Sequence, residues 1–312
     1  MIPERWYAVL ESSEVRKGRP LGVRRLGQDL VFWRDKAGQV VCQRDCCVHR
    51  GAALSAGKLQ EGHIQCPFHG LEYDAAGACT VIPANGRQTP VPAQFRVHTY
   101  PAREAHGFIY VWWGRPRADL PAVPFFDDID AGLSFATARD PWKTHYSRVI
   151  ENQLDPVHLP FVHHNTIGRG NRTIIHGPLV RWITPDLMFV YVDNEVDSGQ
   201  RPRRPSEMEQ PATPFPNLWE NHISPDVRIV AAFVPVDEEN TILYLRFYQR
   251  FAGWPVVRQI VNRLSLPFNL YVAHQDRRVV QTQRPFRTEL RMGETLIQGT
   301  GRSWSIAGAG KS

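Results

Sequence analysis

The chain has 312 residues, of which 42% are hydrophobic and 22% charged, a composition typical of a soluble globular protein long enough for two domains. Its net charge of +6 comes from scattered basic residues, and no apolar stretch approaches the roughly 20 residues of a membrane helix, so we expect neither a nucleic-acid partner nor a membrane span. The first residues, MIPERWYAVL, do not resemble a secretion signal, which favours a cytoplasmic protein. Five cysteines are an odd number in such a chain and favour metal binding over disulfides.

Residues 31–110 predict a small β domain. Short β-rich runs such as LVFWR and FIYVWW alternate there with turn sequences such as KAG and AAG. The proline-rich sequence RPRADLPAVPFFDD interrupts this rhythm and is the expected linker. We therefore place the domain boundary at Arg115, which gives a first domain of residues 1–115 and a second of residues 116–312.

The second domain begins with helical spacing and continues with strand patterns. Residues 142–164 lack glycine and predict a kinked helix or two short helices. Residues 179–196 and 227–251 carry alternating β-branched runs, the second with the turn sequence VDEENT, and predict antiparallel strands. Residues 254–283 return to helical spacing, and the proline- and charge-rich residues 199–217 predict a loop. The whole pattern predicts an α+β protein with an antiparallel sheet in its second domain.

Two short motifs in the first domain, C-V-H and C-P-F-H, each offer one cysteine and one histidine as metal ligands. A structural zinc site tends to take its cysteines as one close pair and its histidines as another, whereas a Rieske [2Fe–2S] cluster needs two thiolates on one iron and two imidazoles on the other. A glycine follows each motif, at Gly51 and Gly70, where the backbone must approach the metal closely. The pairing favours the cluster over a zinc ribbon or a chance grouping. The candidate cluster ligands are Cys47, His49, Cys66 and His69.

A second motif lies in the bent helical segment, in the sequence ENQLDPVHLPFVHH. Asn152, Asp155 and His158 follow one another at intervals of three residues, which predicts that they share one helical face. His163 lies beyond Pro160, and a bend at this proline could aim both imidazoles at one ion. Two imidazoles and one carboxylate on one side of an iron leave the other positions open, as in Fe(II) oxygenases.

The carboxylate of such a site must come from elsewhere in the chain. Spacing alone does not choose among the candidates, and each of them could equally be a solvated surface charge. The eligible residues are Asp276, Glu289, Glu294, Glu220 and Asp237.

The two motifs, in this order, resemble those of the Rieske-type non-haem iron oxygenases, the family of the aromatic ring-hydroxylating oxygenase alpha-subunits. The similarity is greatest to its vanillate demethylase and dicamba monooxygenase branch. Respiratory Rieske proteins carry two further cysteines where this chain has Ala52 and Phe68, which favours the oxygenase type. The chain departs from the pattern at Leu71, where oxygenases commonly have tryptophan, and at Gln275 and Gln281, where the branch often has glutamates.

The resemblance implies an all-β Rieske domain followed by a helix-grip, START-like catalytic domain. It implies an iron ion held by His158, His163 and Asp276, with Asp155 bridging a ligand histidine to a cluster histidine of the neighbouring subunit. Asp155 and Asn152, which both fall on the family motif, are the candidate catalytic residues.

The same resemblance implies an enzyme that uses a [2Fe–2S] cluster and Fe(II) to activate dioxygen. The product would be a hydroxylated or oxidatively demethylated small organic, possibly aromatic, molecule. The electron donor would be a reductase or ferredoxin, and the assembly a head-to-tail homotrimer. The alternative is a Rieske electron-transfer or redox-sensing protein without oxygenase activity, against which the intact set of His158, His163 and Asp276 argues. The sequence does not indicate the substrate.

Overall fold

The computed structural model describes residues 1–184, 187–203, 212–214, 216–288, 293–295 and 297. The chain divides into two compact units, Met1–Val123 and Pro124–Ser312. This division falls inside the proline-rich sequence RPRADLPAVPFFDD, at whose first residue the sequence analysis places the boundary. Glu289, the C-terminal residues 298–312 and part of the loop predicted over residues 199–217 lie outside the described residues.

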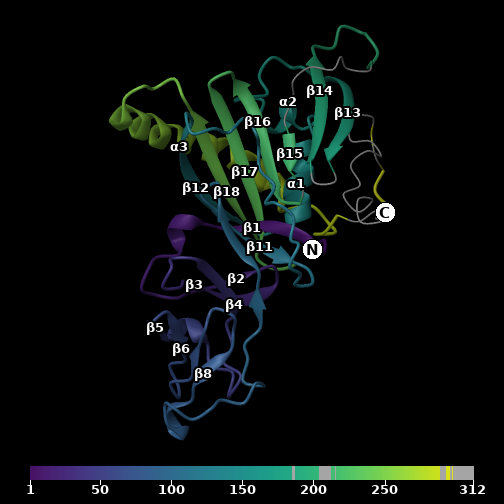
Figure 1. Ribbon diagram of the computed structural model, residues 1–312. Helices are drawn as coiled ribbons and strands as arrows, with labels where there is room; N and C mark the ends of the chain where they lie inside the picture. The colour runs from purple at the N-terminus through teal and green to yellow at the C-terminus, as the bar shows by residue number, and fades with distance from the viewer. Residues whose placement is uncertain (185–186, 204–211, 215, 289–292, 296, 298–312) are drawn as a thin grey trace. The chain divides into compact units, whose positions relative to one another are not determined.

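The first unit contains three antiparallel sheets (Figure 1). Its longest apolar runs, RWYAVLE and FIYVWW, form the paired strands β1 and β11 and are buried along almost their whole length. The β-domain prediction is therefore confirmed. The first sheet consists of β1 (Arg5–Glu11), β11 (Phe108–Trp113) and β10 (Ala102–Ala105); the second of β2 (Leu21–Arg25), β3 (Gln28–Arg34), β4 (Val40–Arg44) and β9 (Thr99–Tyr100); the third of β5 (Lys58–Gln60), β6 (His63–Gln65), β7 (Glu72–Tyr73) and β8 (Cys79–Val81).

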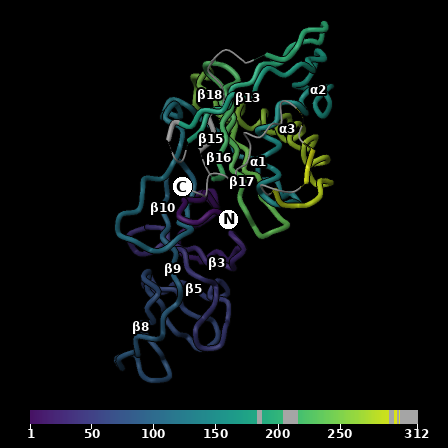
Figure 2. Tube along the Cα trace, turned by 90° about the vertical axis from the view of Figure 1, so that its right-hand side faces the viewer, coloured from purple at the N-terminus to yellow at the C-terminus, as the bar shows by residue number. Residues whose placement is uncertain are grey.

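The described residues of the second unit form two antiparallel sheets and three helices, so the α+β prediction is confirmed. Figure 2 shows the helices on one side of the strands. One sheet consists of β12 (Ser134–Trp142), β18 (Thr241–Gln249), β17 (Val227–Pro235) and β16 (Leu218–Ser224), and the other of β13 (Ile174–Thr184), β14 (Leu187–Glu195) and β15 (Ala212–Pro214). The helices are α1 (Tyr146–Leu154), α2 (Leu159–Val162) and α3 (Pro255–Val280).

Several predictions for this unit agree with the structure. Strands β17 and β18 pair across the predicted turn, and α3 occupies the predicted C-terminal helix. The bent segment forms two short helices, α1 and α2, rather than one kinked helix. The sequence analysis did not predict β12, β15 or β16, and β15 lies inside the predicted loop of residues 199–217. No described helix is both long enough and apolar enough to cross a membrane.

The prediction that Asn152, Asp155 and His158 share one helical face is wrong. Helix α1 ends at Leu154, and Asp155 has an extended backbone with φ −93° and ψ 111°. The cause is Pro156, because the ring of a proline disfavours helical geometry in the residue before it. The chain therefore turns between α1 and α2, and His158 becomes the N-cap residue of α2.

Candidate functional site

The two cysteine–histidine loops of the first unit have the same backbone hydrogen bonds. In the first loop the Gly51 N–H donates to the Cys47 carbonyl and the Cys47 N–H donates to Ala52, both at 2.8 Å. In the second loop the Gly70 N–H donates to the Cys66 carbonyl at 3.1 Å, and the Cys66 N–H donates to the residue after Gly70 at 2.8 Å. Both glycines adopt the left-handed conformation, with φ +71° and +75°, which is why glycine follows each motif.

The four predicted cluster ligands come together with their thiols inside and their imidazoles at the surface. Cys47 and Cys66 are each 2% exposed and belong to one hydrophobic core cluster. Burial raises the pKa of Cys66 most, and the Cys47 thiol raises it further. Hydrogen bonds from the backbone N–H groups of Phe68 and His69 partly offset this rise. The rings of His49 and His69 are exposed, with centroids 4.6 Å apart. This arrangement separates a sulfur side from an imidazole side, as a Rieske cluster requires.

The spacing of these ligands argues against a single zinc ion. The four atoms around a tetrahedral zinc lie about 4 Å or less from one another, given zinc–ligand bonds of about 2.0–2.3 Å. Among the described residues, two groups of ligand atoms gather within 4.8 Å of one another, and both are in the second unit. The set of Cys47, His49, Cys66 and His69 is more open, which suits two irons and two sulfides.

Tyr73 contributes to the cluster site, although the sequence analysis gave it no role. Its hydroxyl lies 3.1 Å from the Cys47 sulfur, and the side chain is fully buried. Burial and the neighbouring thiol raise the pKa of Tyr73 well above its ordinary value. The tyrosine therefore keeps its proton and can donate it in a hydrogen bond to a Cys47 thiolate. A hydrogen bond to a ligand sulfur raises a cluster's reduction potential.

The second motif forms a compact ligand set with Asp276. The Nε2 atoms of His158 and His163 lie 3.3 Å and 2.9 Å from the Asp276 Oδ1 atom. The two histidines flank the short helix α2, and the aspartate comes from α3. His163 and Asp276 are 1% and 4% exposed. Of the carboxylates that spacing left open, Asp276 is the one that the described structure brings to both histidines.

The electrostatics of this set suit a metal ion. Burial would raise the pKa of Asp276, but hydrogen bonding and positive charge from His158 and His163 hold it down to about 2. The Asp276 Oδ1 atom is buried and has no hydrogen-bond partner of good geometry among the described residues. The two Nε2 atoms and the carboxylate oxygens thus converge, with the three ligand atoms within 4.8 Å of one another. Two imidazoles and a carboxylate are the ligands of non-haem Fe(II) sites with open positions, so these residues fit that ion.

Gln275 orients one of the ligands. Its carbonyl oxygen lies 2.9 Å from the His163 Nδ1 atom and also accepts the Thr166 hydroxyl at 2.7 Å. Because a carbonyl can only accept, the Nδ1 atom must carry the proton, which leaves the Nε2 lone pair free for a metal. The sequence analysis noted Gln275 only as a departure from the family pattern. Its position next to Asp276 was the available signal.

Asp155 lies beside His158, His163 and Asp276, the iron-ligand triad, and forms no hydrogen bond with them among the described contacts. One carboxylate oxygen accepts the Val157 N–H at 2.8 Å, and the other lies 4.0 Å from the His158 Nδ1 atom. Burial raises the pKa of Asp155, and the Val157 N–H and His158 partly offset the rise. Asn152 lies within α1, and its buried Nδ2 has no hydrogen-bond partner among the described residues. No described contact joins Asn152 to the ligands.

A cavity of about 470 Å³ opens directly beside the triad. Asp155, His158, His163 and Asp276 form part of its wall, and the remaining wall is mostly apolar. Ligand pockets of proteins typically occupy about 300–1,000 Å³. The metal-binding set therefore faces a space that admits a small organic molecule.

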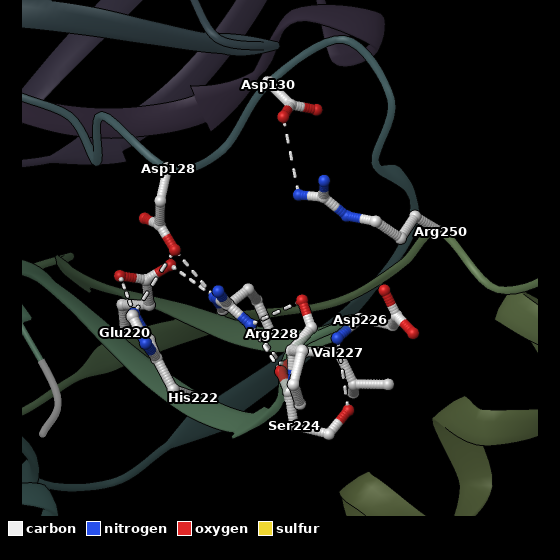
Figure 3. A network of polar contacts seen from close by, with 10 residues as sticks. Asp128, Asp130, Glu220, His222, Ser224, Asp226, Val227, Arg228 and Arg250 are labelled. Atoms are coloured by element: carbon white, nitrogen blue, oxygen red, sulfur yellow. Dashed lines mark hydrogen bonds and ion pairs between the residues drawn. The ribbon is translucent and has the colours of Figure 1, made fainter. Parts of the chain in front are cut away.

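The second group of potential ligands is Asp128, Glu220 and His222. His222 Nε2 lies 3.1 Å from Glu220 and 3.3 Å from Asp128, but Arg228 approaches the same carboxylates, with its Nε atom 2.7 Å from Asp128 (Figure 3). Burial and the charge of Asp128 raise the pKa of Glu220 to about 8. The guanidinium supplies the positive charge here, so the group is an ion-pair network. Glu220 therefore belongs to this network and not to the ligand set of His158 and His163.

The chain matches two family models that together follow its two units. Residues 5–101 match the Rieske [2Fe-2S] domain, and residues 142–297, half of the chain, match the Vanillate O-demethylase oxygenase C-terminal domain. The first matched region contains the four candidate cluster ligands, and the second contains His158, His163 and Asp276.

Curated and solved proteins agree with this assignment. The chain is 38% identical over 197 residues to chlorophyllide a oxygenase of Chlamydomonas reinhardtii, covering 62% of this chain and 28% of that protein. It is 35% identical over 161 residues to the dicamba O-demethylase oxygenase component of Stenotrophomonas maltophilia, covering 51% and 46%. The alignments thus span less than half of either relative. The structure of NdmA from Pseudomonas putida CBB5 shares the fold, with a TM-score of 0.76, 23% identity, and coverage of 95% of this chain and 86% of that one. The chain belongs to the family of the Rieske-type non-haem iron oxygenases.

Proposed function

We propose that the protein is an oxygenase component that activates dioxygen against a small organic substrate, which it hydroxylates or oxidatively demethylates. One observation carries the proposal: the ligand atoms of His158, His163 and Asp276 converge in the wall of a cavity large enough for such a molecule. When bound, the cluster and the iron supply one-electron transfer and dioxygen activation.

The protein's own residues prepare both sites. Cys47, His49, Cys66 and His69 would hold the cluster, and the Tyr73 hydroxyl, 3.1 Å from the Cys47 sulfur, would donate to it once that sulfur is a thiolate. Gln275 fixes the His163 tautomer, and the apolar cavity wall excludes water from the reacting centre.

The electron donor would be a separate reductase or ferredoxin. The dicamba relative is named as the oxygenase component of an O-demethylase, and a structural neighbour is a complex of the carbazole 1,9a-dioxygenase oxygenase with ferredoxin. We also infer a head-to-tail homotrimer in which Asp155 links the iron site to a cluster histidine of the next subunit. The position of Asp155, 4.0 Å from the His158 ring and with a raised pKa, supports this role.

The alternative, a Rieske electron-transfer protein, would need neither the triad nor the cavity beside it. Both are intact in this chain, so the oxygenase is the better proposal.

Metal analysis of anaerobically purified protein tests the proposal. We expect three irons and two acid-labile sulfides per chain, because a [2Fe–2S] cluster and one mononuclear iron would be present. His158→Ala should lose about one iron and no sulfide. His164→Ala is the matched control, because this neighbouring histidine is exposed and, among the described residues, bonds to the Phe161 carbonyl alone. Two irons in the parent and in His158→Ala would favour the electron-transfer protein, and zinc without sulfide would contradict both assignments.

A further inference from the structure

The walls of the cavity follow from the periodicity of the elements that form them. Alternate residues of β14, β16, β17 and β18 face the cavity, as expected for one face of a pleated sheet. Helix α3 contributes residues spaced by three and four, as expected for one stripe of a helix. The strand residues are Val190, Val192 and Asn194 on β14, Trp219, Asn221 and Ile223 on β16, Val227, Ile229 and Ala231 on β17, and Leu243, Leu245 and Phe247 on β18.

The cavity wall contains no lysine or arginine among the described residues. Its ionisable groups are the triad and Asp155, and the two carboxylates among them cannot attract an anion. A carboxylate or sulfonate substrate loses strong hydration when it enters a mostly apolar space, and it needs a cationic partner to recover that loss. The described wall has such a partner only in the histidines that would bind the metal. An anion is therefore disfavoured in the remainder of the cavity.

Four carboxamides interrupt the apolar wall: Asn194 and Asn221 on the strands, Gln153 on α1 and Asn269 on α3. Asn194 and Asn221 line the same cavity from one strand of each sheet, and no described residue forms a hydrogen bond with either side chain. Asn269 differs, because its Nδ2 atom already donates to the Ser265 carbonyl. A carboxamide offers two N–H donors and a carbonyl acceptor, and polar groups that lie against an apolar space are normally paired. Asn194 and Asn221 therefore have unused capacity for a neutral polar group of a ligand.

We propose that the substrate is an uncharged, largely apolar molecule that fits the cavity of about 470 Å³, with a neutral carbonyl, amide, ether or hydroxyl group that Asn194 and Asn221 bind. This inference rests on the proposed oxygenase function and adds to it the class of substrate and two specificity-determining residues.

Equilibrium binding to the anaerobic holoprotein tests this inference without turnover. The probes are 6-methoxy-2-naphthamide and 6-methoxy-2-naphthoate, which match in size and differ in charge. We expect the amide to bind at one site per chain and at least about 10-fold more tightly than the carboxylate, because the cavity wall outside the metal-binding set offers the carboxylate no cationic partner. Equal or tighter binding of the carboxylate, or binding of neither probe, would overturn the inference.

Two variants of Asn221 make the test specific. Asn221→Leu keeps the side-chain size and should weaken amide binding by about 10-fold, because the polar group of the ligand then lies unpaired. Asn221→Arg adds the missing cation and should reverse the preference in favour of the carboxylate. Unchanged amide affinity in Asn221→Leu would exclude the assigned role of this residue. Asn194→Leu should act in the same direction, and near-ultraviolet circular dichroism of each variant checks the fold.

The binding test and the metal test can refute the two proposals separately. Tight amide binding in a protein that contains only two irons would leave the cavity inference intact and refute the oxygenase. A full complement of three irons with preferential carboxylate binding would leave the oxygenase intact and refute the substrate class.

Discussion

At the scale of single residues, the iron site depends on a glutamine that is not a metal ligand. The Gln275 carbonyl oxygen accepts the N–H of His163 Nδ1, with 2.9 Å between oxygen and nitrogen, and the Thr166 hydroxyl donates to the same oxygen. A ligand histidine that keeps one tautomer binds a metal without first moving a proton. The hydrogen bond from Gln275 therefore contributes to metal affinity through His163.

We predict that Gln275→Leu lowers the affinity of the mononuclear site for Fe(II) or Co(II) by about 10- to 100-fold, because the His163 ring loses its orienting partner. Gln275→Glu should retain the affinity, since a carboxylate also accepts the Nδ1 proton. Competitive metal titration against a chelator measures both variants. Similar losses in the two variants would mean that Gln275 acts through packing and not through its hydrogen bond.

The sequence predicted the metal ligands themselves better than the residues that orient them. The spacing of His158 and His163 around Pro160 indicated a shared ion, and the structure brings the two imidazoles to one carboxylate oxygen. The choice of Asp276 needed the family resemblance, because a pairing between α2 and α3 is a long-range contact that no local pattern encodes. The same limit hid Gln275, whose partner lies 112 positions away in the chain.

At the scale of elements, prolines and glycines decide where ligands point. Pro156 ends the helical path at Leu154, so Asp155 departs from the face that simple periodicity assigns to it. Strand β16 was missed because its sequence, LWENHIS, alternates a cavity face with the ion-pair face of Glu220 and His222. A strand with polar residues on both faces lacks the apolar alternation by which strands are recognised.

The paired cluster loops give a prediction at this scale. Gly51 and Gly70 both have positive φ, but a Cβ at Gly70 would lie 3.2 Å from the Pro83 side chain, whereas at Gly51 the nearest atom is a sulfur at 3.9 Å. Gly51→Ala should therefore cost only the backbone strain, about 1 kcal/mol of unfolding free energy. Gly70→Ala should cost about 1 kcal/mol more, because steric crowding adds to the strain.

Denaturant unfolding of the holoprotein, followed by the visible absorption of the cluster, measures the two glycine variants. An exposed glycine with similarly positive φ and open surroundings, Gly18, is the control, because its substitution tests the strain outside the cluster loops. Equal losses at Gly51 and Gly70 would show that contact with Pro83 does not matter.

At the scale of the whole molecule, the second unit contains a buried acid that makes its stability depend on pH. Glu220 is 1% exposed and lies near Asp128, His222 and Arg228 (Figure 3). Burial and the Asp128 charge raise its pKa from 4.5 to about 8, so the folded protein holds this proton more tightly than the unfolded chain. The resulting stabilisation is fully present below the unfolded pKa and is lost as pH rises through the folded pKa.

We predict that Glu220 accounts for a loss of about 2 kcal/mol in unfolding free energy between pH 6 and pH 8, since each pH unit contributes up to about 1.4 kcal/mol. Glu220→Gln cannot ionise and should lack this part of the slope. Urea unfolding of both proteins at several pH values measures it, and Glu239→Gln, at an exposed turn position, is the control. Parallel pH profiles for the parent and Glu220→Gln would mean that Arg228 keeps Glu220 ionised in the folded protein, because only a carboxylate with an unshifted pKa leaves the pH dependence of folding unchanged.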